Sequence, residues 1–361
     1  MSFPRPYVAS PLRYDSGMPY RRTGRSGLRL PAISLGLWQN FGGQDVFETG
    51  RAILRRAFDR GVTHFDLANN YGPPYGSAEE NFGRVLASDF AAHRDELIIS
   101  TKAGWDMWPG PYGDVGSSKK YLIASCDQSL KRMGLDYVDI FYSHRVDAAT
   151  PLEETMAALN TLVSHGKVRY VGCSNYSGWQ VMKGLGISDL RGHPRFVTQQ
   201  IHYTLEAREA EYELLPISVD QGLGILVWSP LAGGLLSGRY GRDEATARHL
   251  GGWTEPPIRD QDRLWRIVDV LKAVGTERGV SAAQVALAWL LGRPAVSSLV
   301  IGGRNEAQFR DNLAAATLVL SEEERTRLDV VSKPPVLYPY WHQQNSARDR
   351  FGPADLVMDR S

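Results

Sequence analysis

The chain contains 361 residues, with 41 lysines and arginines against 40 aspartates and glutamates, for a formal net charge of +1. This length suits one large α/β barrel or two medium domains, and the near-neutral charge gives no reason to expect a nucleic-acid or anionic-membrane partner. No segment approaches the roughly 20 apolar residues of a membrane-spanning helix, and residues 1–17 lack an apolar signal sequence. Two cysteines, Cys126 and Cys173, show no disulfide pattern, so a reducing cytoplasm is the expected location.

Short apolar, β-rich runs alternate with helical patterns along the chain. Several of the runs are continuously apolar, as strands buried on both faces of a parallel sheet are. We expect eight strands, at 31–37, 63–68, 97–102, 138–143, 168–173, 196–200, 223–228 and 297–302. Eight strands with intervening helices predict a single-domain (β/α)8 TIM barrel. Its expected parts are a core over 18–332, an N-terminal extension over 1–17 and an irregular C-terminal tail over 333–361.

The alternative architecture is an open, doubly wound sheet. That fold usually places a glycine-rich G-x-G-x-x-G turn after its first strand. Here the first predicted strand ends in GLWQNFGG, which lacks that spacing. The barrel is therefore the favoured fold.

Helix boundaries are marked by caps and glycines. An apolar stripe predicts a helix over 46–60, stopped by Gly61, and another over 118–133, capped by Ser118 and ended by Gly134. Two further helix starts show the spacing of a capping box: Ser281 with Gln284, and Ser321 with Glu324.

Two connections are unusually long for a compact domain. About 15 residues rich in Trp, Pro and Gly follow the third predicted strand, and about 70 residues separate the seventh from the eighth. The first half of the second connection, 233–262, is rich in Gly and Arg, and loops of this length are usually functional. The segment 333–356 shows no helical period, so it either folds back over the barrel mouth or extends freely.

Three successive predicted strands each run into ionisable residues. Asp66 and Tyr71 follow the second strand, Lys102 ends the third, and His144 follows the fourth. The carboxyl ends of barrel strands meet at one mouth, so we expect these side chains to form one catalytic site. Tyr71 is then the proton donor, and Lys102 is the cation that lowers its pKa from about 10. Asp66 pairs with Lys102, and His144 orients a carbonyl oxygen.

Each of these residues, taken alone, also has a structural explanation. A single aspartate in LANNYG is more often a turn former, and a lone strand-end lysine is usually solvated. We interpret His64, His93 and His165 as structural histidines, and only the joint placement of the other four favours catalysis. No H-E-x-x-H or C-x-x-C pattern predicts a metal site, so the electrons for a redox step must come from an organic cofactor.

With these residues in view, the chain resembles the aldo-keto reductase family across residues 18–332. The matching motifs are DLANNYG, STKAG, YSHR, GKVRYVGCSNYS (166–177) and VWSPLAGGLLSGRY (227–240). The resemblance implies a TIM barrel, a nicotinamide cofactor bound in an extended form, and hydride transfer to aldehydes or ketones. SLGLWQNFGG and DMWPGPYG are most similar to the branch that contains bacterial L-glyceraldehyde-3-phosphate reductases and potassium-channel β subunits.

The resemblance also implies the cofactor contacts. Trp228 would stack on the nicotinamide, and Ser174, Asn175 and Gln200 would bind its carboxamide. Two arginines at the phosphate end, Arg239 and Arg304, favour NADP(H) over NAD(H), although NAD(H) is an alternative. The other implied cofactor residues are Trp38, Gln44, Ser229, Pro230, Leu231, Gly233, Gly234, Gly302, Gln308, Asp311 and Asn312.

The expected activity is NADPH-dependent reduction of a small polar aldehyde: a triose phosphate, methylglyoxal or a short sugar. The expected substrate residues are Trp38, Trp105, Trp108, Tyr112 and Arg145, with a salt bridge outside the site as the alternative for Arg145. Two other functions stay open: an NAD(P)-dependent sugar dehydrogenase, and a regulatory module that senses the cofactor. The presence of His144 favours an enzyme, and near relatives lead us to expect a homo-oligomer, a tetramer or larger.

Overall fold

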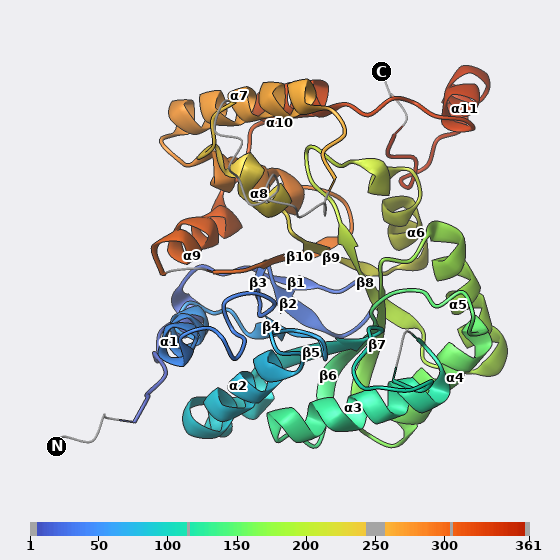
Figure 1. Cartoon of the computed structure of the whole chain (residues 1–361). Coiled ribbons are helices and arrows are strands. Elements are labelled where there is room, and N and C mark those ends of the chain that lie inside the picture. The colour runs from blue at the N-terminus through green and yellow to red at the C-terminus, as the bar shows by residue number, and fades with distance from the viewer. Residues whose placement is uncertain (1–5, 114–115, 243–256, 304–305, 358–361) are drawn as a thin grey trace.

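A closed barrel of parallel strands lies at the centre of the computed structural model, which describes residues 6–113, 116–242, 257–303 and 306–357 (Figure 1). Within these residues eight strands close in the order β10-β3-β4-β5-β6-β7-β8-β9, so each strand pairs in parallel with its neighbour along the chain. The predicted (β/α)8 barrel is confirmed. The barrel strands are β3 Ile33–Gly36, β4 His64–Asp66, β5 Ile98–Ala103, β6 Val138–Ser143, β7 Val168–Ser174, β8 Phe196–His202, β9 Gly224–Trp228 and β10 Val296–Ile301.

An antiparallel hairpin, which the sequence did not predict, precedes the barrel. Its strands are β1 (Tyr20–Arg22) and β2 (Arg29–Pro31). Leu30 is fully buried and packs with Leu226 and Val300, which belong to barrel strands. Since the hairpin leads directly into the start of β3, it closes the amino-terminal end of the barrel with apolar side chains. The two short strands contain several arginines, so they show no run of apolar residues from which a strand could be predicted.

Helices surround the barrel (Figure 1). Within the described residues their bounds are α1 Phe47–Phe58, α2 Ser77–Val85, α3 Lys119–Met133, α4 Leu152–Ser164, α5 Gly178–Arg191, α6 Leu214–Gln221, α7 Gln261–Arg278, α8 Ala282–Leu291, α9 Glu306–Leu313, α10 Glu322–Ser332 and α11 Tyr340–Ser346. In this part of the chain no helix has both the length and the apolar character needed to cross a bilayer.

The predicted helix caps are largely confirmed. Ser118 accepts a hydrogen bond from the backbone of α3, which ends at Gly134 in a left-handed conformation (φ 66°). Ser321 forms a complete capping box with Glu324. The second predicted box is only half present, because Gln284 turns its side chain to Asp311 instead of back to the backbone of Ser281.

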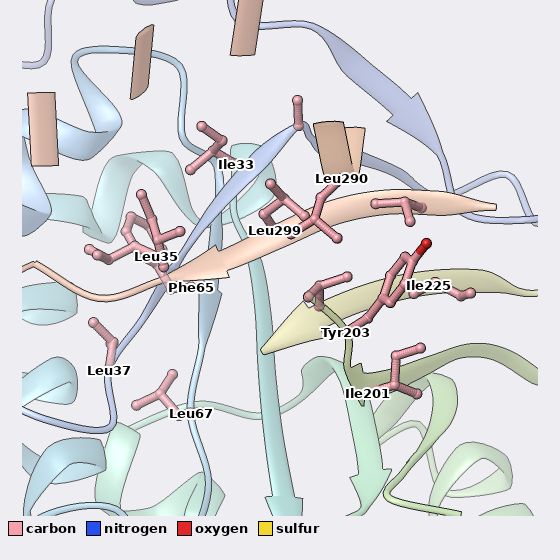
Figure 2. Close-up of a cluster of buried hydrophobic side chains, with 14 of the residues drawn as sticks. Ile33, Leu35, Leu37, Phe65, Leu67, Ile201, Tyr203, Ile225, Leu290 and Leu299 are labelled. Carbon is pink, nitrogen blue, oxygen red and sulfur yellow. The ribbon is translucent and has the colours of Figure 1, made fainter. Parts of the chain in front are cut away.

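Alternate residues of each barrel strand face opposite sides. Ile33 and Leu35 of β3 point outward and share one core cluster with Leu299 of β10 and Leu290 of α8 (Figure 2). The residues between them point into the barrel, and on several strands they are polar. The buried polar side chains inside the barrel include Ser34, His64, Asp66, Ser100, Lys102, Gln200 and Ser298.

The described parts of the N-terminal extension and of the C-terminal tail pack against elements that surround the barrel. In the N-terminal extension, the Tyr7 hydroxyl donates to Asp59 Oδ1 at 2.7 Å, just after α1. The C-terminal tail contains the short helix α11, so the expectation of no helix there was wrong. Tyr340 at the start of α11 donates to the backbone oxygen of Tyr212 at 2.7 Å, which holds the tail against the segment between β8 and α6.

Candidate active site

Three of the four predicted catalytic side chains lie in direct contact at the barrel mouth. Asp66 ends β4, Lys102 lies in β5, and Tyr71 follows β4 in the turn that leads to α2. The ammonium nitrogen of Lys102 is 2.6 Å from Asp66 Oδ2, 2.7 Å from the backbone oxygen of Leu67 and 3.3 Å from the hydroxyl of Tyr71. A fully buried lysine is tolerated here because three oxygens receive its three N–H bonds.

The electrostatics of this group differ from our expectation in one respect. Burial disfavours the charge on Lys102, but Asp66 and Tyr71 outweigh burial and raise its pKa, so the ammonium persists. For Tyr71, burial outweighs the field of Lys102, and its pKa lies above the ordinary value of 10. The expectation that Lys102 brings the pKa of Tyr71 below that value was therefore wrong. The phenol stays protonated at neutral pH, as a proton donor must.

His144 lies beside this group, directly after β6. Its ring centroid is 6.1 Å from that of Tyr71, in an edge-to-face arrangement. Burial, Lys102 and Arg145 all lower its pKa well below 6.5, so the imidazole is neutral. Its Nδ1 is buried and has no hydrogen-bond partner among the described residues. A neutral imidazole next to a phenol can donate one hydrogen bond to a carbonyl oxygen.

An aromatic rim borders the four residues. Trp38, 39% exposed, lies 6.3 Å from the ring of Tyr71, and Trp105, 37% exposed, lies 6.2 Å from the ring of His144. Arg145 stacks on Trp105 at 3.9 Å and donates from Nε to the backbone oxygen of Gly104 at 2.6 Å. Its two terminal nitrogens have no hydrogen-bond partner within the described part of the chain.

The other two expected substrate residues lie further along the same loop. Trp108 stacks on Tyr121 of α3, with ring centroids 5.4 Å apart. Tyr112 is 58% exposed and lies under the ammonium of Lys120 at 5.2 Å. The loop after β5 thus places Trp105 at the rim and sends these two rings toward α3.

A second group of predicted residues joins the site from β7, β8 and β9. Asn175 donates to the backbone oxygen of His144 at 3.1 Å and accepts from the indole nitrogen of Trp228 at 3.1 Å. Ser174 donates to the backbone oxygen of Gln200 at 2.9 Å. Gln200 donates to Asp66 Oδ1 at 3.0 Å. The residues expected around a nicotinamide are therefore tied by hydrogen bonds to the residues expected to be catalytic.

The aldo/keto reductase family model matches residues 32–333. The chain belongs to the aldo/keto reductase family. Over 330 residues, 90% of this chain and 94% of the relative, it is 50% identical to L-glyceraldehyde 3-phosphate reductase of Escherichia coli (strain K12). Over 307 residues, 84% of this chain and 92% of the relative, it is 36% identical to a probable voltage-gated potassium channel subunit beta of Arabidopsis thaliana. This aldo/keto reductase is an NAD(P)H-dependent oxidoreductase that acts on small carbonyl compounds.

The segment after β9, which we expect to lie along the pyrophosphate of this aldo/keto reductase's cofactor, has an unusual backbone. Ser229, Ala232, Gly233 and Gly234 all have positive φ angles, between 48° and 104°. The N–H groups of Ala232 and Gly234 donate to the backbone oxygens of Ser229 and Leu231, and that of Gly233 donates to the hydroxyl of Ser229, so the segment forms a tight turn. Gly233 lacks a side chain and is exposed, so a ligand can approach its backbone. Pro230 and Leu231 lie in the same segment.

Two side chains outside that loop complete the set expected near the pyrophosphate and the ring. Arg239, just beyond the loop, is exposed, and its guanidinium has no hydrogen-bond or ion-pair partner among the described residues. Gln44 is exposed in the connection between β3 and α1. The guanidinium of Arg239 is thus available to an anion.

The corner after β10 is only partly described. Arg304 lies outside the described residues, whereas a Cβ added at Gly302 would meet nothing within 4 Å, which leaves room for a ligand. Gln308 and Asn312 lie half-buried in α9. Asp311 is already engaged, since it accepts from Ser281 at 2.8 Å and from Gln284 at 2.7 Å, so within the protein it ties α9 to α8.

Sequence reasoning missed the side chains that support the site from behind. Ser100 donates to Asp66 Oδ1 at 2.6 Å, and His64 contacts Ser100 at 2.9 Å. His202 packs against Trp228, with ring centroids 4.7 Å apart. The alternation of β5 could have indicated Ser100, because it lies two residues before Lys102 and therefore faces the same side.

Proposed function

We propose that this chain reduces small polar aldehydes, triose phosphates in particular, with NADPH as the reductant and Tyr71 as the general acid. The observation that carries the proposal is the contact between the Tyr71 hydroxyl and the buried ammonium of Lys102, with neutral His144 alongside. A bound nicotinamide would supply the hydride.

Tyr71 and His144 would hold the carbonyl oxygen between them. The carbonyl carbon gains a hydride, and its oxygen takes the proton from Tyr71, so the product is an alcohol and the phenol becomes a phenolate. That phenolate lies 3.3 Å from the Lys102 ammonium, which stabilises it until a proton returns. His144 donates a hydrogen bond to the same oxygen and orients it. Asp66 keeps Lys102 in place and charged.

Arg145 supports the choice of a phosphorylated substrate. Its stacking on Trp105 and its bond to Gly104 fix the guanidinium beside His144 and leave the terminal nitrogens free. A guanidinium with free terminal nitrogens matches a phosphate in a bidentate way. The relative from Escherichia coli is named for the reduction of L-glyceraldehyde 3-phosphate.

Two residues would decide between the cofactors. NADPH differs from NADH by one 2′-phosphate, and Arg239 offers an unpaired guanidinium at the end of the dinucleotide segment. Arg304, outside the described residues, is the second candidate for that phosphate. Around the nicotinamide, Trp228 would stack on the ring, while Ser174, Asn175 and Gln200 would border its carboxamide.

The test is consumption of NADPH, followed by its absorbance, with the purified chain and a panel of carbonyl compounds. The panel pairs glyceraldehyde 3-phosphate with glyceraldehyde, and adds methylglyoxal and aldoses. We expect kcat/KM to be highest for the phosphorylated triose. Turnover of alcohols in the reverse direction alone, or of no compound at all, would contradict the proposal and favour the dehydrogenase or the regulatory module.

Two further expectations belong to this proposal. Both cysteines are buried and free, which suits the reducing cytoplasm. On α5, Trp179 is 66% exposed and Leu190 is 80% exposed, and such apolar side chains support assembly into a tetramer or larger. Light scattering at several protein concentrations tests the assembly, and a monomer throughout would contradict it.

A further inference from the structure

A line of hydrogen bonds runs inside the barrel from β10 to the catalytic group. Ser298 Oγ lies 2.5 Å from Ser34 Oγ, which lies 2.7 Å from Nδ1 of His64. Nε2 of His64 lies 2.9 Å from Ser100 Oγ, and Ser100 donates to Asp66 Oδ1 at 2.6 Å. Side chains from four adjacent strands thus meet in one chain that ends at a carboxylate.

All five side chains of this line are buried, with at most 1% of each residue exposed. Burying a polar group is costly unless it is hydrogen-bonded, and an apolar side chain would fill the same space without that cost. The line therefore calls for an explanation beyond packing, and its end at Asp66 suggests one.

The direction of every hydrogen bond follows from Asp66. A carboxylate can only accept hydrogen bonds, so the hydroxyl of Ser100 must donate to Asp66. The oxygen of that hydroxyl must then accept a hydrogen bond from Nε2 of His64. Nε2 then carries the proton of a neutral imidazole, and Nδ1 accepts from the hydroxyl of Ser34. Ser34 in turn accepts from Ser298. One tautomer of His64 satisfies the whole line.

The surroundings of His64 keep its imidazole neutral. Its pKa is lowered from 6.5 to about 4 by burial, with a smaller contribution from Lys102 that Asp66 opposes. The charged groups that influence the pKa of His64 are Asp66 and Lys102. Lys102 is held as an ammonium by Asp66, so no nearby group competes for the Nε2 proton at neutral pH.

We propose that His64 is a positioning residue for the reduction: as the Nε2-protonated imidazole it orients the hydroxyl of Ser100, which holds the carboxylate of Asp66 in place. This inference rests on the proposed function. The two carboxylate oxygens of Asp66 have different partners. Oδ1 accepts hydrogen bonds from Ser100 and Gln200, and Oδ2 accepts one from Lys102. Fixing Oδ1 therefore fixes Oδ2, and with it the ammonium that contacts Tyr71.

The first experiment does not depend on activity. In protein labelled with ¹⁵N-histidine, long-range ¹⁵N–¹H correlation spectra report the tautomer and charge of each imidazole, and His64→Gln identifies the signal of His64. We expect a neutral ring protonated at Nε2 from about pH 8 down to about pH 5.5, given the lowered pKa. A ring protonated at Nδ1, or one that titrates near pH 6.5, would overturn the inference.

The second experiment is a double-mutant cycle on kcat with glyceraldehyde 3-phosphate and NADPH. Ser100→Ala should lower kcat about ten-fold, because it removes a hydrogen bond to a charged group, and His64→Leu should lower it by a smaller factor. If His64 acts through Ser100, the double variant is no slower than Ser100→Ala. The KM and the affinity for NADPH should stay within about two-fold of the parent.

Controls separate a failure of this inference from other failures. Ser125→Ala removes a buried hydroxyl on α3 that has no hydrogen-bond partner among the described residues, and it should leave kcat unchanged. Ser100→Thr and His64→Gln, which keep a hydroxyl and an N–H donor, should recover most of the activity. Independent, multiplying losses in the cycle would reduce His64 to a packing role. If the parent itself turns over no aldehyde, the proposed function fails while the spectra still test the line.

Discussion

This molecule contains two similar clusters of buried charged side chains, which differ in the hydrogen-bonding groups that they leave without a partner. At the barrel mouth, Asp66 and Lys102 form an ion pair of 2.6 Å with almost no exposure. Beneath the C-terminal part of the chain, Arg208 and Arg293 share Glu211 at 2.9 and 3.3 Å, and both also reach Asp329 at 3.3 Å. Each cluster balances its charges, so burial alone does not distinguish them.

The arginine cluster is closed. Each guanidinium nitrogen of Arg208 and Arg293 has a partner, and Trp289 covers both groups while donating from its indole to Asp329. The hydroxyl of Tyr203 also donates into it, to Glu211. The cluster joins the segment after β8 to α10, and it borders a cavity that is also lined by Pro334 and Leu356.

The lysine cluster is open toward the mouth. The Tyr71 hydroxyl accepts from Lys102, and among the described residues it has no acceptor for its own proton. The two clusters therefore differ in the group that they leave unpaired: the lysine cluster presents a hydroxyl that can donate its proton at the barrel mouth, whereas every guanidinium nitrogen of the arginine cluster has a protein partner.

The largest effect is expected when the tyrosine hydroxyl of each cluster is removed in turn, which tests whether only the lysine cluster is catalytic. Tyr71→Phe should lower kcat by about 10²–10⁴-fold, the usual contribution of a general acid, and leave NADPH affinity near that of the parent. Tyr203→Phe is the matched control in the closed cluster, and we expect it to lower stability with little change in kcat. Steady-state kinetics and thermal unfolding of both variants decide the matter, and full activity in Tyr71→Phe would remove the assigned acid.

The next largest effect concerns the closed cluster itself. Glu211→Ala leaves two buried guanidinium groups short of an anion, which typically costs about 3–5 kcal/mol of unfolding free energy. Chemical denaturation measures this loss, and kcat of the folded fraction should not change. A Glu211→Ala enzyme with normal stability and impaired turnover would mean that the two clusters do not divide their roles as described.

Two buried histidines should make the stability of the fold depend on pH. The pKa values of His64 and His202 are lowered from 6.5 to about 4 by burial, so between those pH values the unfolded state binds more protons than the folded state. The contribution of these two histidines to stability is therefore complete above about pH 6.5 and is lost as the pH drops toward 4, by on the order of 3 kcal/mol for the fully buried His64. Glu206, whose pKa is raised to about 7 by burial, contributes with the opposite sign, so the histidine effect is read from the difference between the parent and the variant. Denaturation midpoints from pH 7.5 to 4.5 measure it, and His64→Gln should flatten the curve.

A smaller effect is expected at the rim of the open cluster. Arg145→Gln should raise the KM for glyceraldehyde 3-phosphate about ten-fold, as the loss of one charge-assisted contact to a phosphate does. Glyceraldehyde, which lacks the phosphate, serves as the matched substrate and should be affected much less. Equal losses for both substrates would assign Arg145 to the architecture of the loop.

The smallest effect is expected at the exposed cofactor arginine. Arg239→Gln should weaken NADPH binding several-fold and NADH binding hardly at all, because only NADPH carries the 2′-phosphate. Fluorescence titration with both cofactors measures the ratio. Arg304→Ala is the companion variant, and equal losses for NADPH and NADH in both variants would discard the phosphate contact.

How far the sequence predicts this molecule depends on whether a feature is local. Continuous apolar runs ending in Asp66, Lys102 and His144 were enough to predict the barrel and to bring these residues to one mouth, because strand direction fixes where strand ends meet. The hairpin at 20–31 escaped, since arginines break its apolar pattern and its stability comes from packing under the barrel.

Other features of the site depend on distances that no local pattern contains. The pKa of Tyr71 is the balance of burial against Lys102, and only the structure gives both. Likewise Asp311 is a helix-to-helix tie because α8 happens to lie beside α9. The role that we propose for His64 is not predictable from the sequence for the same reason, because its partners Ser34 on β3 and Ser100 on β5 are known only from the structure.

The hairpin beneath the barrel has a consequence for the passage of water. Leu28 and Leu30 are buried and pack with Leu226 and Val300 of the barrel, so they hinder the entry of solvent at its amino-terminal end. Deuterium from the solvent then replaces the imidazole hydrogen of His64 when the hairpin moves away from the barrel or when the residues at the barrel mouth open. The rate of that replacement therefore measures how often one of the two ends of the barrel opens.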